Sequence, residues 1–271
     1  MQKNFLYRVF SLCIALPAFL FMLVYSRWSY LGLFAFISSV CLYEFLKMNR
    51  GILSRIDKYI VTFLGLSFYL LSFFIIFEKI KIKWMLIPPV VMLIFNFYKV
   101  FSTKRKSSVN ALGVVSLGFI YITFPFCLTH ILVIREGEYC YKYLLFTFLC
   151  IWGADTGGYV FGNLFGKRKI FPSVSPNKTW EGALGGCLSS IVFGFLGNYF
   201  MKIFSQNLIL IIVSFFIAFF SIWGDFLESF LKRSLGVKDS GKIIPGHGGM
   251  LDRFDSFIST SVVVAFLINF L

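Results

Sequence analysis

The chain has 271 residues, of which 58% are hydrophobic and 14% carry a formal charge. Soluble domains contain about 25% charged residues, so this composition excludes an ordinary soluble domain and predicts a protein with several membrane-spanning segments. The net charge of +14 does not indicate nucleic-acid binding, because no soluble basic domain carries it, and we expect no nucleic-acid partner.

Nine apolar segments predict membrane-spanning helices, because a helix needs about 20 mostly apolar residues to cross a bilayer. In chain order they cover residues 9–26, 29–46, 59–77, 84–101, 111–134, 143–162, 182–204, 207–228 and 254–271. The fourth segment is short and contains Pro88 and Pro89, and its loss would change the topology. The predicted fold class is an all-α integral membrane protein with about nine transmembrane helices.

Basic residues are divided unevenly between the two ends of these segments. If the N-terminus lies in the cytoplasm, most of the 26 Lys and Arg residues fall on cytoplasmic segments. Cytoplasmic loops of membrane proteins are enriched in Lys and Arg. The distribution therefore predicts a cytoplasmic N-terminus and places the polar loops of the second half of the chain on the cytoplasmic face.

Acidic residues concentrate in the second half of the chain. Of the twelve, seven follow residue 150, and all seven lie in or beside the last two predicted cytoplasmic loops. We therefore expect an N-terminal scaffold of membrane helices, residues 1–142, followed by a catalytic membrane region, residues 143–271. In the scaffold, Glu44 is expected at the membrane interface and His130 in the core.

A polar stripe marks the end of the eighth predicted helix, in the sequence GDFLESFLKRS. Asp225, Glu228, Ser229 and Lys232 follow the spacing i, i+3, i+4 and i+7, which places them on one face of a helix. A ladder of ion pairs at a helix end would also account for this spacing. Asp225 nevertheless follows the apolar run FFSIWG, and an ionisable group at membrane depth is costly and usually functional.

A second polar stripe begins the last predicted helix. Asp252, Asp255, Ser256 and Ser259 repeat the same spacing, directly after the sequence PGHGG. A glycine-rich segment that leads into a helix N-terminus favours anion binding. Helix capping also explains acidic residues at this position, although it leaves the glycine-flanked His247 unexplained.

The two stripes together indicate a site for phosphoryl or nucleotidyl transfer. Two helix ends joined by a short basic loop could bring Asp225 close to Asp252 or Asp255. Oxygen ligands without His or Cys clusters suit Mg²⁺. Carboxylates that hold a divalent metal beside cations that hold phosphate are the parts that such a reaction needs. The nearby cations are Lys232, Arg233, Lys238 and Lys242.

A third polar region, residues 152–186, contains Asp155, many glycines and a basic run at 167–169. The sequence GNLFGKR is one residue too short for a phosphate-binding P-loop, and no Ser or Thr follows Lys167, so we reject that interpretation. The glycines of GALGG indicate close helix packing more than ligand contact.

The sequence SPNKTWEG within this region contains several residues that suit a helix start. Ser175, Asn177 and Thr179 are possible N-caps, and Pro176 suits a first helical position. Lys178 and the hydroxyl groups at a helix N-terminus would equally suit a phosphate. The sequence leaves capping and phosphate binding open here.

The 27 residues from Ser229 to Asp255, SFLKRSLGVKDSGKIIPGHGGMLDRFD, resemble the signature of phosphatidate cytidylyltransferases, also called CDP-diacylglycerol synthases. The sequences FGKRK and SPNKTWEG are also similar to this family, and the resemblance covers about residues 145–256. It implies an enzyme that transfers CMP from CTP to phosphatidate and releases pyrophosphate, with Mg²⁺ as cofactor and K⁺ as a second candidate ion. It further implies a homodimer in the cell membrane of a bacterium.

The resemblance also implies roles for individual residues. Asp225 and Asp252 would bind the metal, Asp255 would be a supporting acid, and Lys232 and Arg233 would complete the catalytic set. Residues expected to bind the nucleotide or phosphates are Ser229, Lys238, His247, Lys167, Ser175, Lys178 and Thr179.

Two other functions remain alternatives at this stage. A CTP-dependent lipid kinase, acting for example on a polyprenol, would use similar substrates but leave a phosphate on the lipid. A transporter could use Asp155 and Asp225 as an ion path, although the sequence has none of the inverted repeats that would favour this.

Overall fold

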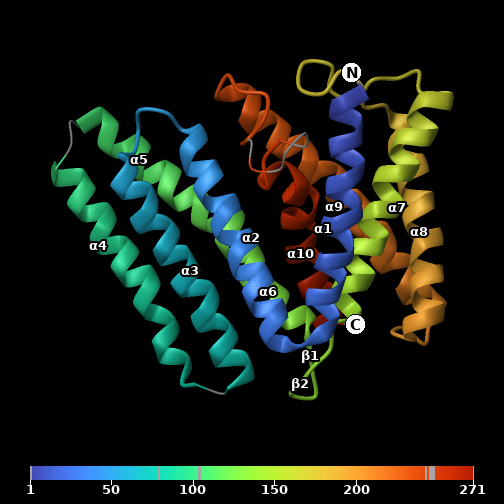
Figure 1. The fold of residues 1–271 in the computed structure, drawn as a ribbon, viewed down its shortest axis with the longest axis horizontal. Coiled ribbons are helices and arrows are strands. Elements are labelled where there is room, and N and C mark those ends of the chain that lie inside the picture. The colour runs from blue at the N-terminus through green and yellow to red at the C-terminus, as the bar shows by residue number, and fades with distance from the viewer. Residues whose placement is uncertain (1, 79, 103–104, 242, 244–247, 271) are drawn as a thin grey trace. The chain divides into compact units, whose positions relative to one another are not determined.

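The computed structural model describes residues 2–78, 80–102, 105–241, 243 and 248–270, and these are almost entirely helical (Figure 1). The helices are α1 (Gln2–Tyr25), α2 (Arg27–Met48), α3 (Arg55–Phe77), η1 (Ile82–Leu86), α4 (Ile87–Ser102), α5 (Arg105–Gly118), η2 (Phe119–Thr123), α6 (Phe124–Leu132), α7 (Lys142–Phe165), α8 (Trp180–Met201), α9 (Asn207–Ser234) and α10 (Leu251–Phe270). Two short strands, β1 (Ile134–Arg135) and β2 (Glu138–Tyr139), complete the described structure.

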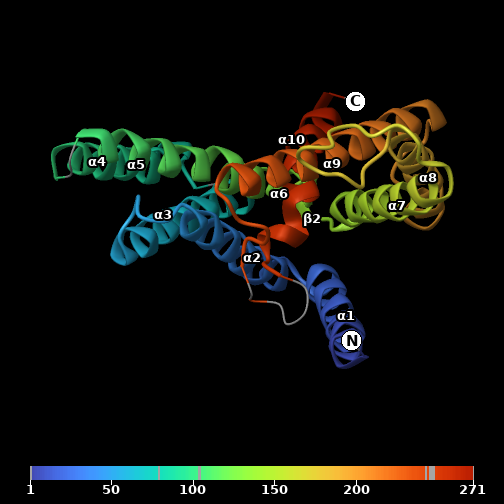
Figure 2. The same cartoon turned by 90° about the horizontal axis from the view of Figure 1, so that it is seen from above.

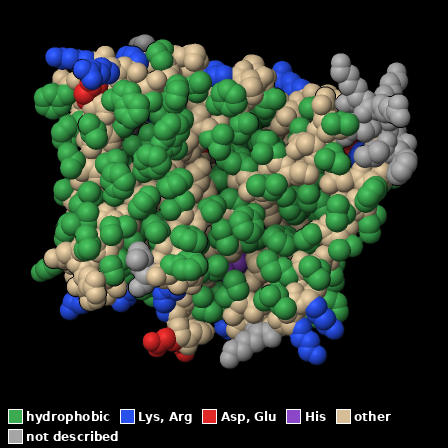
Figure 3. Space-filling view, turned by 180° about the vertical axis from the view of Figure 1, so that it is seen from behind, with side chains coloured by type: hydrophobic (Ala, Val, Ile, Leu, Met, Phe, Trp, Pro, Cys, Tyr) green, Lys and Arg blue, Asp and Glu red, His purple; other side chains and the backbone are tan. Residues whose placement is uncertain are grey.

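Seven helical stretches among the described residues are long and apolar enough to cross a membrane. They are Arg27–Met48, Arg55–Phe77, Ile82–Lys99, Val109–Leu132, Lys142–Phe165, Trp180–Met201 and Asn207–Ser234. Hydrophobic side chains make up most of the surface drawn in Figure 3, as expected for helices that face lipid. These findings confirm an all-α membrane protein, whereas the count of nine spans and the cytoplasmic N-terminus stay predictions.

Several helices begin at residues whose side chains satisfy backbone N–H groups that have no partner within the helix. Ser26 precedes α2 and Ser54 precedes α3, and each forms a capping box with the residue three positions later. Thr179 caps α8 by accepting a hydrogen bond from the Gly182 N–H at 3.1 Å. Local sequence therefore fixes where these helices start.

The chain divides into two compact units, each described here by itself. The first unit contains residues 1–130, 136–139 and 239–253. The glycine-rich segment and the first residues of α10 thus group with the N-terminal helices, although the sequence suggested a scaffold that ends at residue 142. The expected boundary after residue 142 stays a prediction of domain organisation.

The core of the first unit is rich in aromatic rings and contains His130. Tyr30, Tyr69 and Phe73 are fully buried around this histidine. The His130 Nδ1 atom lies 3.0 Å from the Tyr30 hydroxyl, and its Nε2 atom lies 3.1 Å from the Tyr69 carbonyl oxygen. Both ring nitrogens therefore have partners inside the protein, which confirms the expected core histidine.

The second unit contains residues 131–135, 140–238 and 254–271, and its α7 and α8 pack side by side (Figure 2). Glycines allow this close approach. A Cβ atom at Gly157 would lie 2.7 Å from the Gly185 carbonyl oxygen, and one at Gly186 would lie 2.8 Å from the Ala154 carbonyl oxygen. The prediction that GALGG serves helix packing is confirmed, and the tight pair holds the loop 166–179 at its end.

Candidate active site

Asp225, the first residue of the first polar stripe, is held by groups from two elements. It forms an ion pair with Lys178, which lies in the loop between α7 and α8. One turn further along α9, the Ser229 Oγ atom donates a hydrogen bond to Asp225 Oδ1 at 3.3 Å. The side chains of Lys178 and Asp225 are 28% and 35% exposed, so a ligand can reach both charges.

Glu228 and Lys232 form a second ion pair within α9. They are four residues apart, and their side chains are 1% and 12% exposed. The alternative of an ion-pair ladder is therefore correct for this part of the stripe. It is wrong for Asp225, because the ion pair of that carboxylate reaches across to Lys178.

Further acidic residues gather near Asp225 within the second unit. Asp155 on α7 and Asp255 on α10 both lie within electrostatic range of it, and Asp255 also lies within range of Glu228. A Cβ atom at Gly224 would lie 2.9 Å from the Asp255 carbonyl oxygen, which shows how closely α9 approaches α10. Two neighbouring helices, α7 and α10, thus place acidic residues near Asp225.

The second polar stripe shows a different arrangement around Asp252. The Ser240 N–H donates to both carboxylate oxygens, at 3.1 and 3.0 Å, and the Gly249 N–H donates to Oδ2 at 2.8 Å. The capping alternative is therefore supported, since Asp252 satisfies backbone donors ahead of α10.

Glu44 on α2 is a site residue that the sequence analysis missed. It was expected at the membrane interface, but it is 1% exposed. Its Oε2 atom accepts hydrogen bonds from the Ser240 Oγ at 3.2 Å and from the Leu251 N–H at 2.9 Å. Its depth in the membrane stays a prediction, and an acid inside an apolar helix was the signal that pointed to a functional role.

The loop 166–179 corrects part of the prediction for SPNKTWEG. Thr179 alone caps the following helix, and Pro176 lies in a turn before it rather than at its first position. The caps expected at Ser175 and Asn177 are therefore wrong. The loop is fixed instead by Glu181, whose carboxylate accepts hydrogen bonds from the Lys167 and Arg168 N–H groups at 3.1 to 3.3 Å.

The other residues that were predicted to form the site differ in how exposed they are. Lys167, Arg233 and Lys238 are exposed, and Ser175 is half-buried. Thr179 is buried and engaged in its cap. His247 lies outside the described residues. Asp225 and Asp252 belong to different units, so their predicted pairing stays a prediction.

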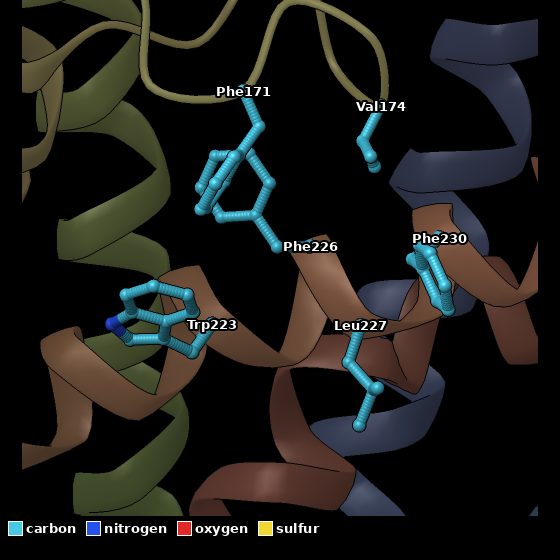
Figure 4. A pocket seen from close by; sticks show the side chains of 6 residues that line it. All are labelled: Phe171, Val174, Trp223, Phe226, Leu227 and Phe230. Atoms are coloured by element: carbon cyan, nitrogen blue, oxygen red, sulfur yellow. The ribbon is translucent and has the colours of Figure 1, made fainter.

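An apolar pocket lies beside the Lys178–Asp225 ion pair. Phe171 and Val174 of the loop face a row of side chains on α9, around a cavity of about 350 Å³ (Figure 4). The α9 residues are Trp223, Phe226, Leu227 and Phe230. The Lys178 ammonium nitrogen lies 4.5 Å from the centre of the Phe226 ring, so the charged pair and the apolar pocket adjoin.

The comparison with known proteins decides the family. The model of the cytidylyltransferase family matches residues 6–271. The chain belongs to this family. A phosphatidate cytidylyltransferase of Bacillus subtilis is 34% identical over 262 residues, which cover 96% of each chain.

Staphylococcal relatives carry the same name. One from Staphylococcus epidermidis is 43% identical over 167 residues, covering 59% of this chain and 60% of the relative. Another, from Staphylococcus saprophyticus, is 36% identical over 217 residues, covering 70% of this chain and 84% of the relative. The polar helix ends described above are therefore those of a cytidylyltransferase-family membrane protein.

Proposed function

We propose that this cytidylyltransferase-family protein transfers CMP from CTP to phosphatidate, giving CDP-diacylglycerol and pyrophosphate for phospholipid synthesis. The observation that carries the proposal is the similarity to the Bacillus subtilis phosphatidate cytidylyltransferase over 96% of both chains. The ion-paired Asp225, close to an apolar pocket, supports it, because the lipid substrate combines a phosphate with hydrocarbon.

The reaction exchanges one bond at the α-phosphorus of CTP for another. An oxygen of the phosphatidate phosphate forms a bond to that phosphorus, while the bond to the bridging oxygen of the β-phosphate breaks. Pyrophosphate leaves with the electron pair of the broken bond. The attacking phosphate is already ionised near neutral pH, so the reaction does not require a side chain as general base.

The donor groups suit Mg²⁺ bound together with a nucleotide. Among the described residues, no three acidic, imidazole or thiol groups converge closely enough to hold a metal ion by themselves. Mg²⁺ is commonly held by one or two carboxylates with water and substrate phosphates, rather than by a complete protein cage. Asp225 and Asp252 are the proposed carboxylates, and bound Mg²⁺ would neutralise charge on the phosphates. K⁺ is a second candidate ion.

Positive side chains in the second unit supply the complementary charge for the phosphates. Lys178 is the strongest candidate, since it is partly exposed and reaches Asp225 from a separate element. Lys167, Arg233 and Lys238 are exposed and also suit the nucleotide phosphates. Lys232 is more enclosed and acts with Glu228. Asp255 supports the cluster as a further acid.

The remaining proposed substrate contacts are Ser229, Ser175, Thr179 and His247. Ser229 donates to Asp225 and so orients that carboxylate, while Ser175 lies three residues before Lys178. Thr179 contributes through its helix cap, which sets the start of α8 after the loop. His247 is proposed to contact the nucleotide.

The apolar pocket beside Lys178 suits the hydrocarbon part of phosphatidate next to its headgroup. Phe171 and Phe230 offer apolar surface close to the charged pair of Lys178 and Asp225. We further propose that the protein has nine spans with a cytoplasmic N-terminus. In that topology it lies in the bacterial cell membrane as a homodimer and takes CTP from the cytoplasm.

The direct test supplies the purified protein in detergent with CTP, phosphatidate and Mg²⁺. We expect pyrophosphate and CDP-diacylglycerol in equal amounts, and no product when Mg²⁺ is chelated. A polyprenol that becomes phosphorylated while CDP appears would instead identify a lipid kinase. Failure of both reactions with a monodisperse preparation would refute the proposed function.

A further inference from the structure

Glu44 makes a long-range contact with the described part of the signature segment. It lies on α2, 196 positions before Ser240, yet its Oε2 atom accepts the Ser240 hydroxyl and the Leu251 N–H. The side chain is 1% exposed, and no described residue donates a hydrogen bond to its Oε1 atom. A buried carboxylate is costly unless it is paired or hydrogen-bonded.

Two glycines of the signature leave the space that the Glu44 carboxyl group fills. A Cβ atom at Gly249 would lie 2.6 Å from Glu44 Oε2, and one at Gly241 would collide with Oε1 and lie 2.7 Å from the carboxyl carbon. Neither glycine has a positive φ angle. Close packing, rather than backbone conformation, therefore requires glycine at these two positions. The packed neighbour is Glu44 at Gly241, and it is Glu44 together with the Ser240 hydroxyl at Gly249.

Ser240 links Glu44 to Asp252. Its hydroxyl donates to Glu44, while its backbone N–H donates to both oxygens of Asp252. Gly249 is similarly shared, because its N–H donates to Asp252 and its Cα packs against Glu44. The backbone donors that orient Asp252 are therefore the same groups that Glu44 holds in place.

We propose that Glu44 is a positioning residue, which holds the two chain segments at Ser240 and Gly249 and thereby orients the Asp252 carboxylate. This inference rests on the proposed function for its kinetic consequence, since Asp252 is a proposed Mg²⁺ ligand. It assigns an N-terminal membrane helix a direct part in arranging the site. The alternative is that Glu44 merely stabilises the fold.

The chain provides a matched control in Asp57. This acid is also buried, belongs to the same unit, and accepts the Ser54 N–H at 2.9 Å and the Lys99 ammonium at 2.6 Å. Within the described part of the segment, residues 239–241, 243 and 248–251, no hydrogen bond or ion pair joins it to Asp57. Asp57→Asn should therefore lower stability without altering the signature segment.

Hydrogen–deuterium exchange in detergent tests the proposal without requiring substrate. In Glu44→Ala, the Leu251 amide loses its acceptor, and the Ser240 and Gly249 amides lose the support that holds them against Asp252. All three should therefore exchange about 10- to 100-fold faster. Glu44→Gln, which keeps one acceptor oxygen, should give an intermediate effect. Asp57→Asn should leave the three amides at the wild-type rate.

Kinetics provide the second readout. For the folded fraction of Glu44→Ala, kcat should fall about 10- to 100-fold and the Mg²⁺ requirement should rise, with Glu44→Gln in between. Asp57→Asn should retain the wild-type kcat. The stability lost in Gly241→Ala should be restored in part by adding Glu44→Ala, because the collision with the Glu44 carboxyl group disappears. Such coupling is expected for residues in contact.

The outcomes separate the two proposals. Wild-type exchange rates at Ser240, Gly249 and Leu251 in Glu44→Ala would overturn the positioning role. Uniformly faster exchange throughout the first unit, as for a general loss of stability, would overturn it as well. If the wild-type protein forms no CDP-diacylglycerol, the proposed function fails, while the exchange data still decide the role of Glu44.

Discussion

The two regions that carry the signature residues restrain their key aspartates in different ways. Asp252 is held by backbone N–H groups and, through them, by Glu44. Asp225 is held by the flexible side chains of Lys178 and Ser229. A carboxylate fixed by the main chain is preorganised, whereas one paired with a lysine can exchange that partner when a ligand arrives. The same residue type is therefore rigid in one region and adjustable in the other.

Removing either carboxylate charge should have the largest effect. Asp252→Asn and Asp225→Asn should each lower turnover at least about 100-fold, because a hard divalent cation depends on ligand charge. The double variant should be little worse than either single variant, since residues acting together are non-additive. Turnover measured against Mg²⁺ concentration checks this. Asn is also a good cap, so an active Asp252→Asn enzyme with unchanged Mg²⁺ dependence would leave capping as the role of Asp252.

The adjustable region can be probed through its lysine. Lys178→Ala should lower kcat/KM for CTP about 10- to 100-fold, because it removes a charge-assisted contact to phosphate. Lys169→Ala is the matched control, since Lys169 is exposed in the same loop and pairs with Thr179 only through its backbone. Equal rates for the two variants would show that Lys178 only neutralises Asp225.

Most of the fold could be predicted from sequence, because the length of an apolar segment determines whether it can form a membrane-spanning helix. The nine expected segments are mostly helical, although 84–101 covers both η1 and α4 and 111–134 covers α5, η2 and α6. The end of one was wrong, since α9 continues to Ser234, six residues past the expected end at 228. The helix continues because its polar stripe still has apolar residues on the other face. The length of the apolar segment alone does not show where a helix such as α9 ends.

The site was harder to predict, because its restraints join positions far apart in the chain. The spacing of Asp225 and Ser229 correctly placed them on one helix face. No local pattern indicated that Glu44 lies against Ser240, or that the Asp225 carboxylate pairs with Lys178. Before α8, the residues Ser175, Asn177 and Thr179 all suited an N-cap. Only the packing of α8 on α7 selected Thr179.

The packing of α7 on α8, which supports the loop that carries Lys178, should be disturbed by a substitution at Gly157 but not at the adjacent Gly158. Gly157→Ala should destabilise the protein by about 1–3 kcal/mol, because its Cβ would overlap Ser189 and approach the Gly185 oxygen at 2.7 Å. Gly158→Ala should be neutral or stabilising by up to about 1 kcal/mol, since its nearest contact is 3.7 Å. Thermal unfolding in detergent compares them, and an equal response would contradict the close α7–α8 packing.

The smallest expected effect concerns the cap of α8. Thr179→Ala should cost about 1 kcal/mol by removing the acceptor for the Gly182 N–H. Ser175→Ala should change stability little, because Ser175 caps no helix here. The same unfolding measurement applies, and a larger loss for Ser175→Ala would show that the cap is assigned to the wrong residue.

The position of the label transferred from CTP tests the central claim most directly. The purified protein is incubated with Mg²⁺, phosphatidate and CTP labelled at either the α- or the γ-phosphate, and the lipid is then extracted. We predict that the α-label enters the lipid as CDP-diacylglycerol and that the γ-label remains in water as pyrophosphate. Transfer of the γ-label to lipid, or of neither label, would contradict the account.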